Sequence, residues 1–214
     1  MKITKYEHAC FGIETHGKQL LIDPGNFTTN TPLDNTVSVL VLTHEHPDHC
    51  DGATINALIA RSPDLTIVGP ASVVTTLQKT ISAQWVVATP GDSINLAPFS
   101  LRIFGGSHAV IHPDIPQIHN IGVMINNTVY YPGDSFTIPD TPIRVLALPV
   151  SAPWLRIRDV IDYVRHVAPS VAFPTHDAIL SKTGKHLIDS MLVQHTEAIG
   201  TQYKRIDDAP LELE

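Results

Sequence analysis

Short apolar runs, separated by Gly, Pro, Asn and Asp, divide this chain into alternating strands and helices. The runs at residues 37–42 and 144–148 are apolar apart from Ser38 and Arg144, which is typical of strands buried on both faces of a parallel sheet. Breakers such as Asp23-Pro24-Gly25 end the strands sharply. The other strands are predicted over residues 2–7, 10–15, 19–22, 65–68, 85–88, 93–96, 101–104, 121–125, 128–131, 171–173 and 202–206.

Helical periodicity is clearest over residues 156–167, where Ile157, Val160, Ile161 and Val164 fall on one face. Further helices are predicted over residues 53–60, 71–80 and 185–199. Strands interleaved with helices place the chain in the α/β class.

The chain also contains an internal echo. Residues 11–25 and 121–134 both read as a hairpin that ends in an acidic Pro-Gly turn, and an apolar strand follows each. We therefore expect a single domain, residues 1–214, built from two similar halves of about 1–99 and 100–214. A site would then lie between the halves and be formed by strand ends.

Composition narrows the functional classes. The formal net charge is −7 and no basic cluster stands out, so long nucleic acid is not an expected partner, whereas a small anionic molecule remains compatible. Two cysteines provide no disulfide framework, and neither a signal-like nor a membrane-spanning apolar run is present. We expect a cytoplasmic protein with no membrane partner, and a homo-oligomer is left open.

The strand at 37–42 runs directly into a stretch rich in metal-binding side chains. Within six positions it holds His44, His46, Asp48 and His49. Imidazole and carboxylate are ligands of Zn²⁺ and similar ions. His44 and His46 would point to one side of extended backbone, and the turn at Pro47 would aim the other two at a second position nearby. The spacing favours two metal positions; the alternative is a polar loop that is rich in histidine.

Three more candidate ligands occur in one shared sequence pattern. In each case an apolar strand is followed by a small or strand-breaking residue and then by the ligand-type side chain. The three candidates are His108 after residues 101–104, Asp134 after residues 128–131, and His176 after residues 171–173. Because active sites of open sheets collect at strand ends, we expect these side chains to share the site of the histidine-rich stretch.

With Asp23 upstream, the motif His44-Glu45-His46-Pro47-Asp48-His49 and the later His108, Asp134 and His176 resemble the metallo-β-lactamase superfamily. The resemblance extends over nearly the whole chain. Within the superfamily, the start of the chain (Met1 to Phe11) and the segment from His108 to Pro116 look closest to small metal-dependent hydrolases of the ascorbate-6-phosphate lactonase-like branch.

The resemblance implies an αββα sandwich of two mixed sheets flanked by helices, with two divalent ions, Zn²⁺ first and Mn²⁺ or Fe as alternatives. It implies that His44, His46 and His108 hold one ion, that Asp48, His49 and His176 hold the other, and that Asp134 bridges them. Asp23 would orient the ligand loop.

The implied activity is hydrolysis of an ester, lactone or phosphoester bond in a small anionic metabolite. A hydroxide between the metals would attack, and Asp48 and Asp134 would be the catalytic carboxylates. The alternatives are a phosphodiesterase or nuclease acting on short nucleotides, and a metal-binding module without turnover.

For several residues near these motifs, the sequence is compatible with two alternative roles. His8 would either support the ligands or be a hydrogen-bonded structural histidine. His112 and Asn120 would either contact substrate or belong to a solvated loop, and Trp154 would either wall the pocket or pack in the core. Cys50 is expected to be a small packing residue.

Overall fold

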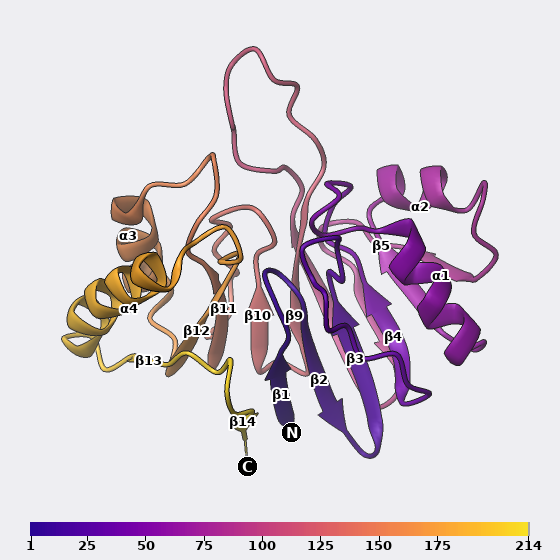
Figure 1. The fold of residues 1–214 in the computed structure, drawn as a ribbon, viewed down its shortest axis with the longest axis horizontal. Coiled ribbons are helices and arrows are strands. Elements are labelled where there is room, and N and C mark those ends of the chain that lie inside the picture. The colour runs from indigo at the N-terminus through magenta and orange to yellow at the C-terminus, as the bar shows by residue number, and fades with distance from the viewer. Residues whose placement is uncertain (214) are drawn as a thin grey trace.

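The computed structural model describes residues 1–213, which form two seven-stranded sheets packed face to face (Figure 1). The first sheet has the order β14 (Leu211–Glu212), β1 (Lys2–Lys5), β2 (Phe11–Thr15), β3 (Lys18–Ile22), β4 (Val37–Val41), β5 (Thr66–Gly69) and β6 (Gln84–Val87). The second has the order β13 (Gln202–Tyr203), β12 (Val171–Thr175), β11 (Val145–Pro149), β10 (Val129–Tyr131), β9 (Ile121–Ile125), β8 (Phe99–Gly105) and β7 (Ser93–Leu96).

Both sheets are mixed. From β3 to β6 the neighbours run parallel, and so do those from β10 to β13, whereas the remaining neighbours run antiparallel. The apolar runs predicted for parallel strands account for this, because β4 and β11 are covered on both faces and nearly all their residues are buried.

The main core lies between the sheets. Phe11 of the first sheet packs edge-on against Tyr131 and Phe173 of the second, with ring centroids 5.4 Å apart in each pair. Burying these aromatic side chains and the aliphatic residues around them supplies the main driving force for closing one sheet on the other.

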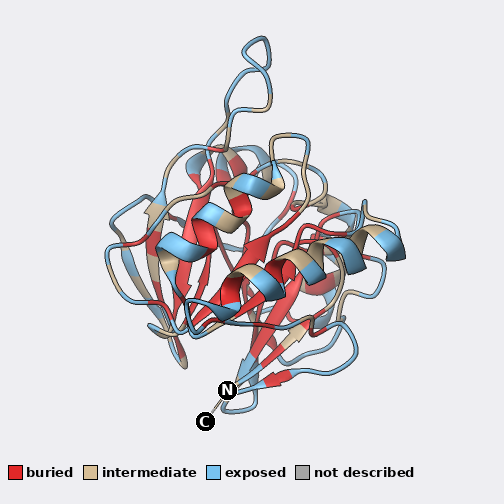
Figure 2. Ribbon diagram, turned by 90° about the vertical axis from the view of Figure 1, so that its left-hand side faces the viewer, coloured by how far each residue is buried: buried red, intermediate tan, exposed pale blue. Residues whose placement is uncertain are grey.

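Helices cover the outer faces. The first sheet carries α1 (Gly52–Arg61) and α2 (Ala71–Leu77), and the second carries α3 (Ile157–Val167) and α4 (Lys182–Glu197), at opposite ends of Figure 1. Figure 2 shows the helices with exposed residues outward and buried ones against the sheet. The layers are therefore helix, sheet, sheet and helix, and the predicted αββα sandwich is confirmed. Among the described residues, no helix is both long and apolar enough to cross a membrane.

Some element boundaries differ from those predicted. The second sheet begins before residue 100, because β7 pairs antiparallel with β8 and so joins the later strands. The helix predicted from residue 185 begins at Lys182, where the Ser181 hydroxyl accepts a hydrogen bond from the Gly184 amide. The strand predicted over residues 202–206 is only Gln202–Tyr203, and Arg205 beyond it forms ion pairs with Asp177 and Asp189. A further strand, β14, follows and pairs with β1 in the first sheet.

One edge of the sandwich collects the candidate ligands. β8 and β10 are both antiparallel to β9 and so run in the same direction, which β11 and β12 share. The segments after β8, β10 and β12 therefore leave the same edge, where they meet the segments after β3 and β4. The long connection between β8 and β9 projects from this edge (Figure 1).

Candidate metal centre

The histidine-rich loop after β4 is held in place by Asp23, which follows β3. The Asp23 carboxylate accepts hydrogen bonds from the Thr43 amide at 2.8 Å, the Thr43 hydroxyl at 2.5 Å and His49 Nδ1 at 2.7 Å. Asp23 is fully buried and adopts a left-handed φ of 43°. The turn after it packs so tightly that a Cβ built on Gly25 would lie 1.9 Å from the Asp48 carbonyl carbon. Only glycine therefore fits at position 25.

One group of ligand-type atoms comes from His44, His46 and His108, which lie within 4.8 Å of one another. His44 Nε2 and His46 Nδ1 are 3.1 Å apart, and the His46 and His108 ring centroids are 4.7 Å apart. Two of the residues come from the loop after β4 and the third from the segment after β8, so the two sheets contribute jointly.

A second group contains Asp48, His49 and His176, with His8 beside them. Asp48 Oδ2 lies 3.3 Å from His176 Nε2 and 3.7 Å from His49 Nε2. His176 follows β12 and has a φ of 59°, a left-handed conformation that non-glycine residues seldom adopt. This unusual backbone turns the imidazole toward the residues of the first sheet.

Asp134 lies between the two groups. Its Oδ2 is 3.4 Å from His108 Nε2 and 3.1 Å from His176 Nε2, and its Oδ1 is 3.3 Å from His49 Nε2. One carboxylate therefore reaches imidazoles of both groups, as a bridging ligand must.

Hydrogen bonds at the opposite ring nitrogens orient these histidines. His108 Nδ1 donates to the Ala109 carbonyl at 2.6 Å, and His176 Nδ1 donates to the Ser151 carbonyl at 2.5 Å, because a carbonyl oxygen can only accept. His49 Nδ1 likewise donates to Asp23. Each ring thus presents Nε2 to the interior of the site, an arrangement usual for metal-ligating histidines.

The atoms at the centre of the site have no hydrogen-bond partner. Nε2 of His49, His108 and His176 and Oδ1 of Asp134 are all buried and unsatisfied among the described residues. Unpaired buried polar atoms are costly and rare in native proteins. Four of them, converging from both sheets, fit a divalent cation that would accept their lone pairs.

The electrostatics of the site also calls for positive charge. Burial by itself would favour neutral His176, but the carboxylates of Asp134 and Asp48 outweigh burial and raise the imidazole pKa to about 10. Burial likewise opposes ionisation of Asp134, yet His49 and His176 hold its pKa well below the ordinary range. Burial and the neighbouring imidazoles lower the pKa of His44, which keeps that ring neutral and able to donate a lone pair.

His8 belongs to the cluster but is oriented as a hydrogen-bond donor. Its Nδ1 accepts from the Ala178 amide at 3.3 Å, so Nε2 carries the proton and donates to Asp48 Oδ2 at 3.0 Å. A protonated Nε2 has no lone pair for a metal. This geometry favours His8 as a support for Asp48, the first of the two readings that the sequence left open.

The three candidate substrate residues have different positions. Asn120 is fully buried, donates to the Pro132 carbonyl and accepts from the Asp134 amide, so it stabilises the Asp134 turn from inside; the alternative of a solvated loop residue is wrong, and its contact with substrate stays a prediction. Trp154 is half-buried and donates to Asp134 Oδ2 at 2.9 Å. His112 is exposed in the projecting connection, and its contact with substrate stays a prediction.

Glu45 is exposed and Cys50 is half-buried against the apolar cluster beneath α1, as a packing residue would be. Two supporting residues, Thr43 and Asp177, have no signal in the sequence that would have indicated their role. Thr43 links Asp23 to His44, whose Nδ1 lies 3.1 Å from the Thr43 hydroxyl. Asp177, next to His176, is buried with Lys5, and only the packing of one sheet against the other makes these residues, 172 positions apart, neighbours.

Comparison with known proteins agrees with this architecture. A family model described as a beta-lactamase superfamily domain matches residues 2–176. Protein Rv0786c of Mycobacterium tuberculosis is 33% identical over 201 residues, which cover 92% of this chain and 93% of that protein. A UPF0173 metal-dependent hydrolase of Geobacillus sp. (strain WCH70) is 36% identical over 212 residues, covering 84% of this chain and 92% of that protein.

Among solved structures, Igni18, a metallo hydrolase from Ignicoccus hospitalis, superposes with a TM-score of 0.76 at 20% identity and covers 100% of this chain and 99% of its own. At that identity the likeness shows the fold alone. The matched family model and the relatives show that the chain belongs to the metallo-β-lactamase superfamily.

Proposed function

We propose that this protein is a metal-dependent hydrolase that uses two divalent ions. The observation that carries the proposal is the convergence of buried, unpartnered Nε2 atoms of His49, His108 and His176 on the Asp134 carboxylate. The Geobacillus relative is described as a metal-dependent hydrolase, which supports the same activity here.

Each ligand group would hold one ion. His44, His46 and His108 offer three imidazoles, and Asp48, His49 and His176 offer two imidazoles and a carboxylate. Asp134 would bridge the groups, because its two oxygens lie near imidazoles of both. Nitrogen and carboxylate ligands without thiolate fit Zn²⁺ best, and also suit Mn²⁺ or Fe.

Bound in this way, the ions would lower the pKa of a shared water to near neutrality and polarise the oxygen of the bond under attack. The chain's own residues orient the side chains that would bind the ions. His8 donates to Asp48 and Trp154 donates to Asp134, which restrains the rotation of both carboxylates. Asp23 holds His49 and, through Thr43, the start of the ligand loop. Preorganised ligands spare the reaction the cost of arranging them.

The substrate class is a small anionic molecule with an ester, lactone or phosphoester bond. The negative charge of the chain does not favour long nucleic acid, and a lactone is the substrate that the predicted subgroup implies. The loops that surround the site choose the substrate, and the fold alone does not.

The test is metal analysis of the purified protein together with hydrolysis of ester, lactone and phosphodiester probes. We expect about two ions per chain, loss of turnover after chelation, and recovery when Zn²⁺ or Mn²⁺ is added back. Turnover that continues in a chelator after the metal has been removed would contradict the proposal. If short nucleotides were cleaved in preference to the other probes, the bond that the protein hydrolyses would be a phosphodiester and not a lactone or ester. Tight metal binding without turnover of any probe would indicate a non-catalytic module.

A further inference from the structure

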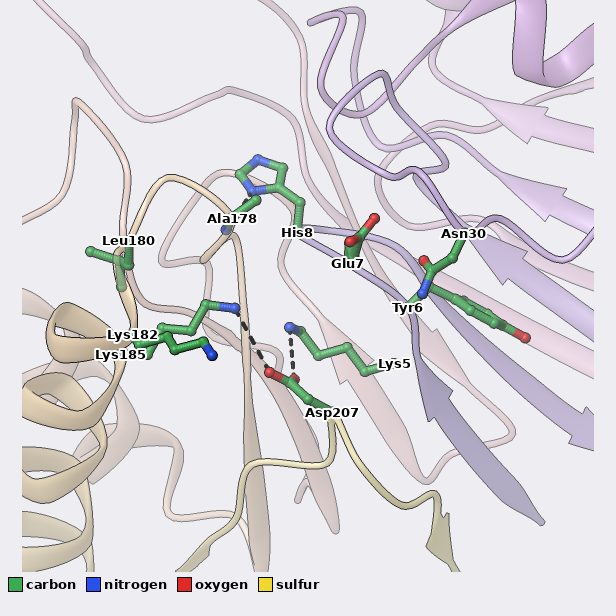
Figure 3. Close-up of a pocket in the computed structure, with 10 residues that line it drawn as sticks. All are labelled: Lys5, Tyr6, Glu7, His8, Asn30, Ala178, Leu180, Lys182, Lys185 and Asp207. Carbon is green, nitrogen blue, oxygen red and sulfur yellow. Dashed lines mark hydrogen bonds and ion pairs between the residues drawn. The ribbon is translucent and has the colours of Figure 1, made fainter.

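A pocket of about 480 Å³ lies beside the metal centre, on the side of the second ligand group (Figure 3). We call it the lysine pocket; its polar lining includes Lys5, His8, Asn30, Lys182, Lys185 and Asp207. The residues come from the end of β1, the β1–β2 connection, the loop after β3, the start of α4 and the segment after β13. None of the ligand-type residues assigned above to the ions lines the pocket.

His8 forms the wall between the pocket and the metal centre. His8 is one of the lining residues, its side chain is fully buried, its Nε2 donates to Asp48, and its ring centroid lies 4.0 Å from that of His176. A molecule in the pocket would therefore lie one imidazole ring away from the second ligand group. Phe27, which is 44% exposed, packs edge-on against the same ring with centroids 5.1 Å apart and adds an apolar surface at this point.

The lining carries more positive than negative charge, although the whole chain is acidic. Figure 3 shows the ammonium ends of Lys5, Lys182 and Lys185 directed to the same space beside Asp207. Against these three lysines stand only Asp207 and Glu7 among the lining residues. Glu7 is bonded to Thr29, whose amide and hydroxyl donate to it at 2.5 and 2.8 Å.

Two of the lysines are already paired at the floor. Lys5 Nζ lies 2.8 Å from Asp177 and 3.1 Å from Asp207, and Lys185 Nζ lies 3.2 Å from Asp177 and 3.7 Å from Asp207. Arg205 bonds both carboxylates as well. The acidic groups at the floor are therefore neutralised. Lys182 is exposed at the first turn of α4 and adds a further positive charge at the rim.

We propose that the lysine pocket binds an oxyanionic group of the substrate, a carboxylate or a phosphate, while the bond to be cleaved lies at the metal centre. The proposal rests on the hydrolase function proposed above and extends it to the part of the substrate that is not cleaved. Lys182 and Lys185 would form charge-assisted hydrogen bonds to the oxyanion, and the apolar middle of the substrate would pass along the exposed surface of Phe27.

The first experiment compares two p-nitrophenyl esters that differ in charge, the neutral butyrate and the anionic monoester of glutarate, with the metal-loaded full chain. Lys182→Ala should lower kcat/KM for the glutarate ester about fivefold more than for the butyrate ester, and Lys182→Glu should widen that difference. The matched control is Lys79→Ala, because Lys79 is exposed after α2, at the opposite end of the molecule. Equal changes for both esters in the Lys182 variants would overturn the proposal.

The second experiment needs no turnover and so separates the two proposals. Binding of inorganic phosphate to the metal-loaded protein is measured by titration calorimetry for the wild type, Lys182→Ala, Lys182→Glu and Lys79→Ala. We expect Kd to rise about fivefold in Lys182→Ala, further in Lys182→Glu, and not in Lys79→Ala. Identical Kd values in all four proteins would overturn the proposal that the lysine pocket binds an oxyanion, whether or not the protein hydrolyses the esters. If neither ester is hydrolysed but phosphate binding depends on Lys182, the proposed hydrolysis of esters fails while the anion site stands.

Discussion

The indole Nε1 of Trp154 donates a hydrogen bond at 2.9 Å to Oδ2 of Asp134, the same oxygen that lies 3.1 Å from His176 Nε2. Trp154 comes from the segment after β11 and Asp134 from the segment after β10, so neighbouring parallel strands place the two side chains together. The ring also packs against Phe136, with centroids 5.2 Å apart. Trp154 therefore positions the carboxylate that joins the two ligand groups.

Replacing Trp154 with Phe should weaken metal binding while it keeps most of the ring packing. Loss of the donor leaves Asp134 freer to rotate, and losses of this kind typically cost about tenfold in metal affinity. Competition with a chromophoric chelator measures the affinity. Trp85→Phe is the matched control, because Trp85 lies in β6, its Nε1 donates to the Ile81 carbonyl, and neither residue belongs to a ligand group. Equal affinities in both variants would remove the positioning role of Trp154.

Asp23→Asn should reduce metal affinity by about 10- to 100-fold. The amide keeps the size of the side chain but no longer provides two carboxylate oxygens to Thr43 and His49. Metal content after dialysis against a weak chelator is the measurement. Asp51→Asn serves as the control, because Asp51 caps α1 beside the same loop and Asn caps helices about as well. If Asp23→Asn retained metal as fully as Asp51→Asn, Asp23 would not orient the loop.

Gly25→Ala should displace the histidine-rich loop. The added methyl group would meet the Asp48 backbone at 1.9 Å, far inside contact distance, so the loop must move or the protein must unfold in part. We expect lower thermal stability and lower metal affinity, measured by calorimetry and by chelator competition. Gly52→Ala, at the start of α1 with open space around it, should instead be neutral or stabilise the fold by up to about 1 kcal/mol.

Lys5→Met should destabilise the fold strongly. Lys5 is buried between Asp177 and Asp207, and its removal leaves the fully buried Asp177 with only the half-buried partners Lys185 and Arg205, so we expect a cost of up to about 3–5 kcal/mol. Lys2→Met, in the same strand, removes an exposed pair with Glu14 and should cost at most about 1 kcal/mol. Urea denaturation of the four proteins, wild type, both single variants and the double variant, measures the difference. Similar costs for the two lysines would show that the buried cluster contributes little.

Much of the fold follows from local patterns. The apolar runs of β4 and β11 and the one-sided periodicity of α3 are properties of neighbouring residues, and the structure has elements at those places. The residue at which the second sheet begins was harder to predict from the sequence, because β7 joins that sheet through its pairing with β8. Strand order depends on contacts between distant residues, which periodicity does not reveal.

For the site, the spacing of His44, His46, Asp48 and His49 after a buried strand determined by itself that this loop is suited to metal ligands, because two-residue alternation and the turn at Pro47 act within a few residues. Only the tertiary structure decided that Asp134 reaches imidazoles from both sheets, that Asn120 is an internal support, and that Lys5 meets Asp177. Those relationships depend on the direction and register of strands far apart in the chain, and packing of the two sheets against each other sets them.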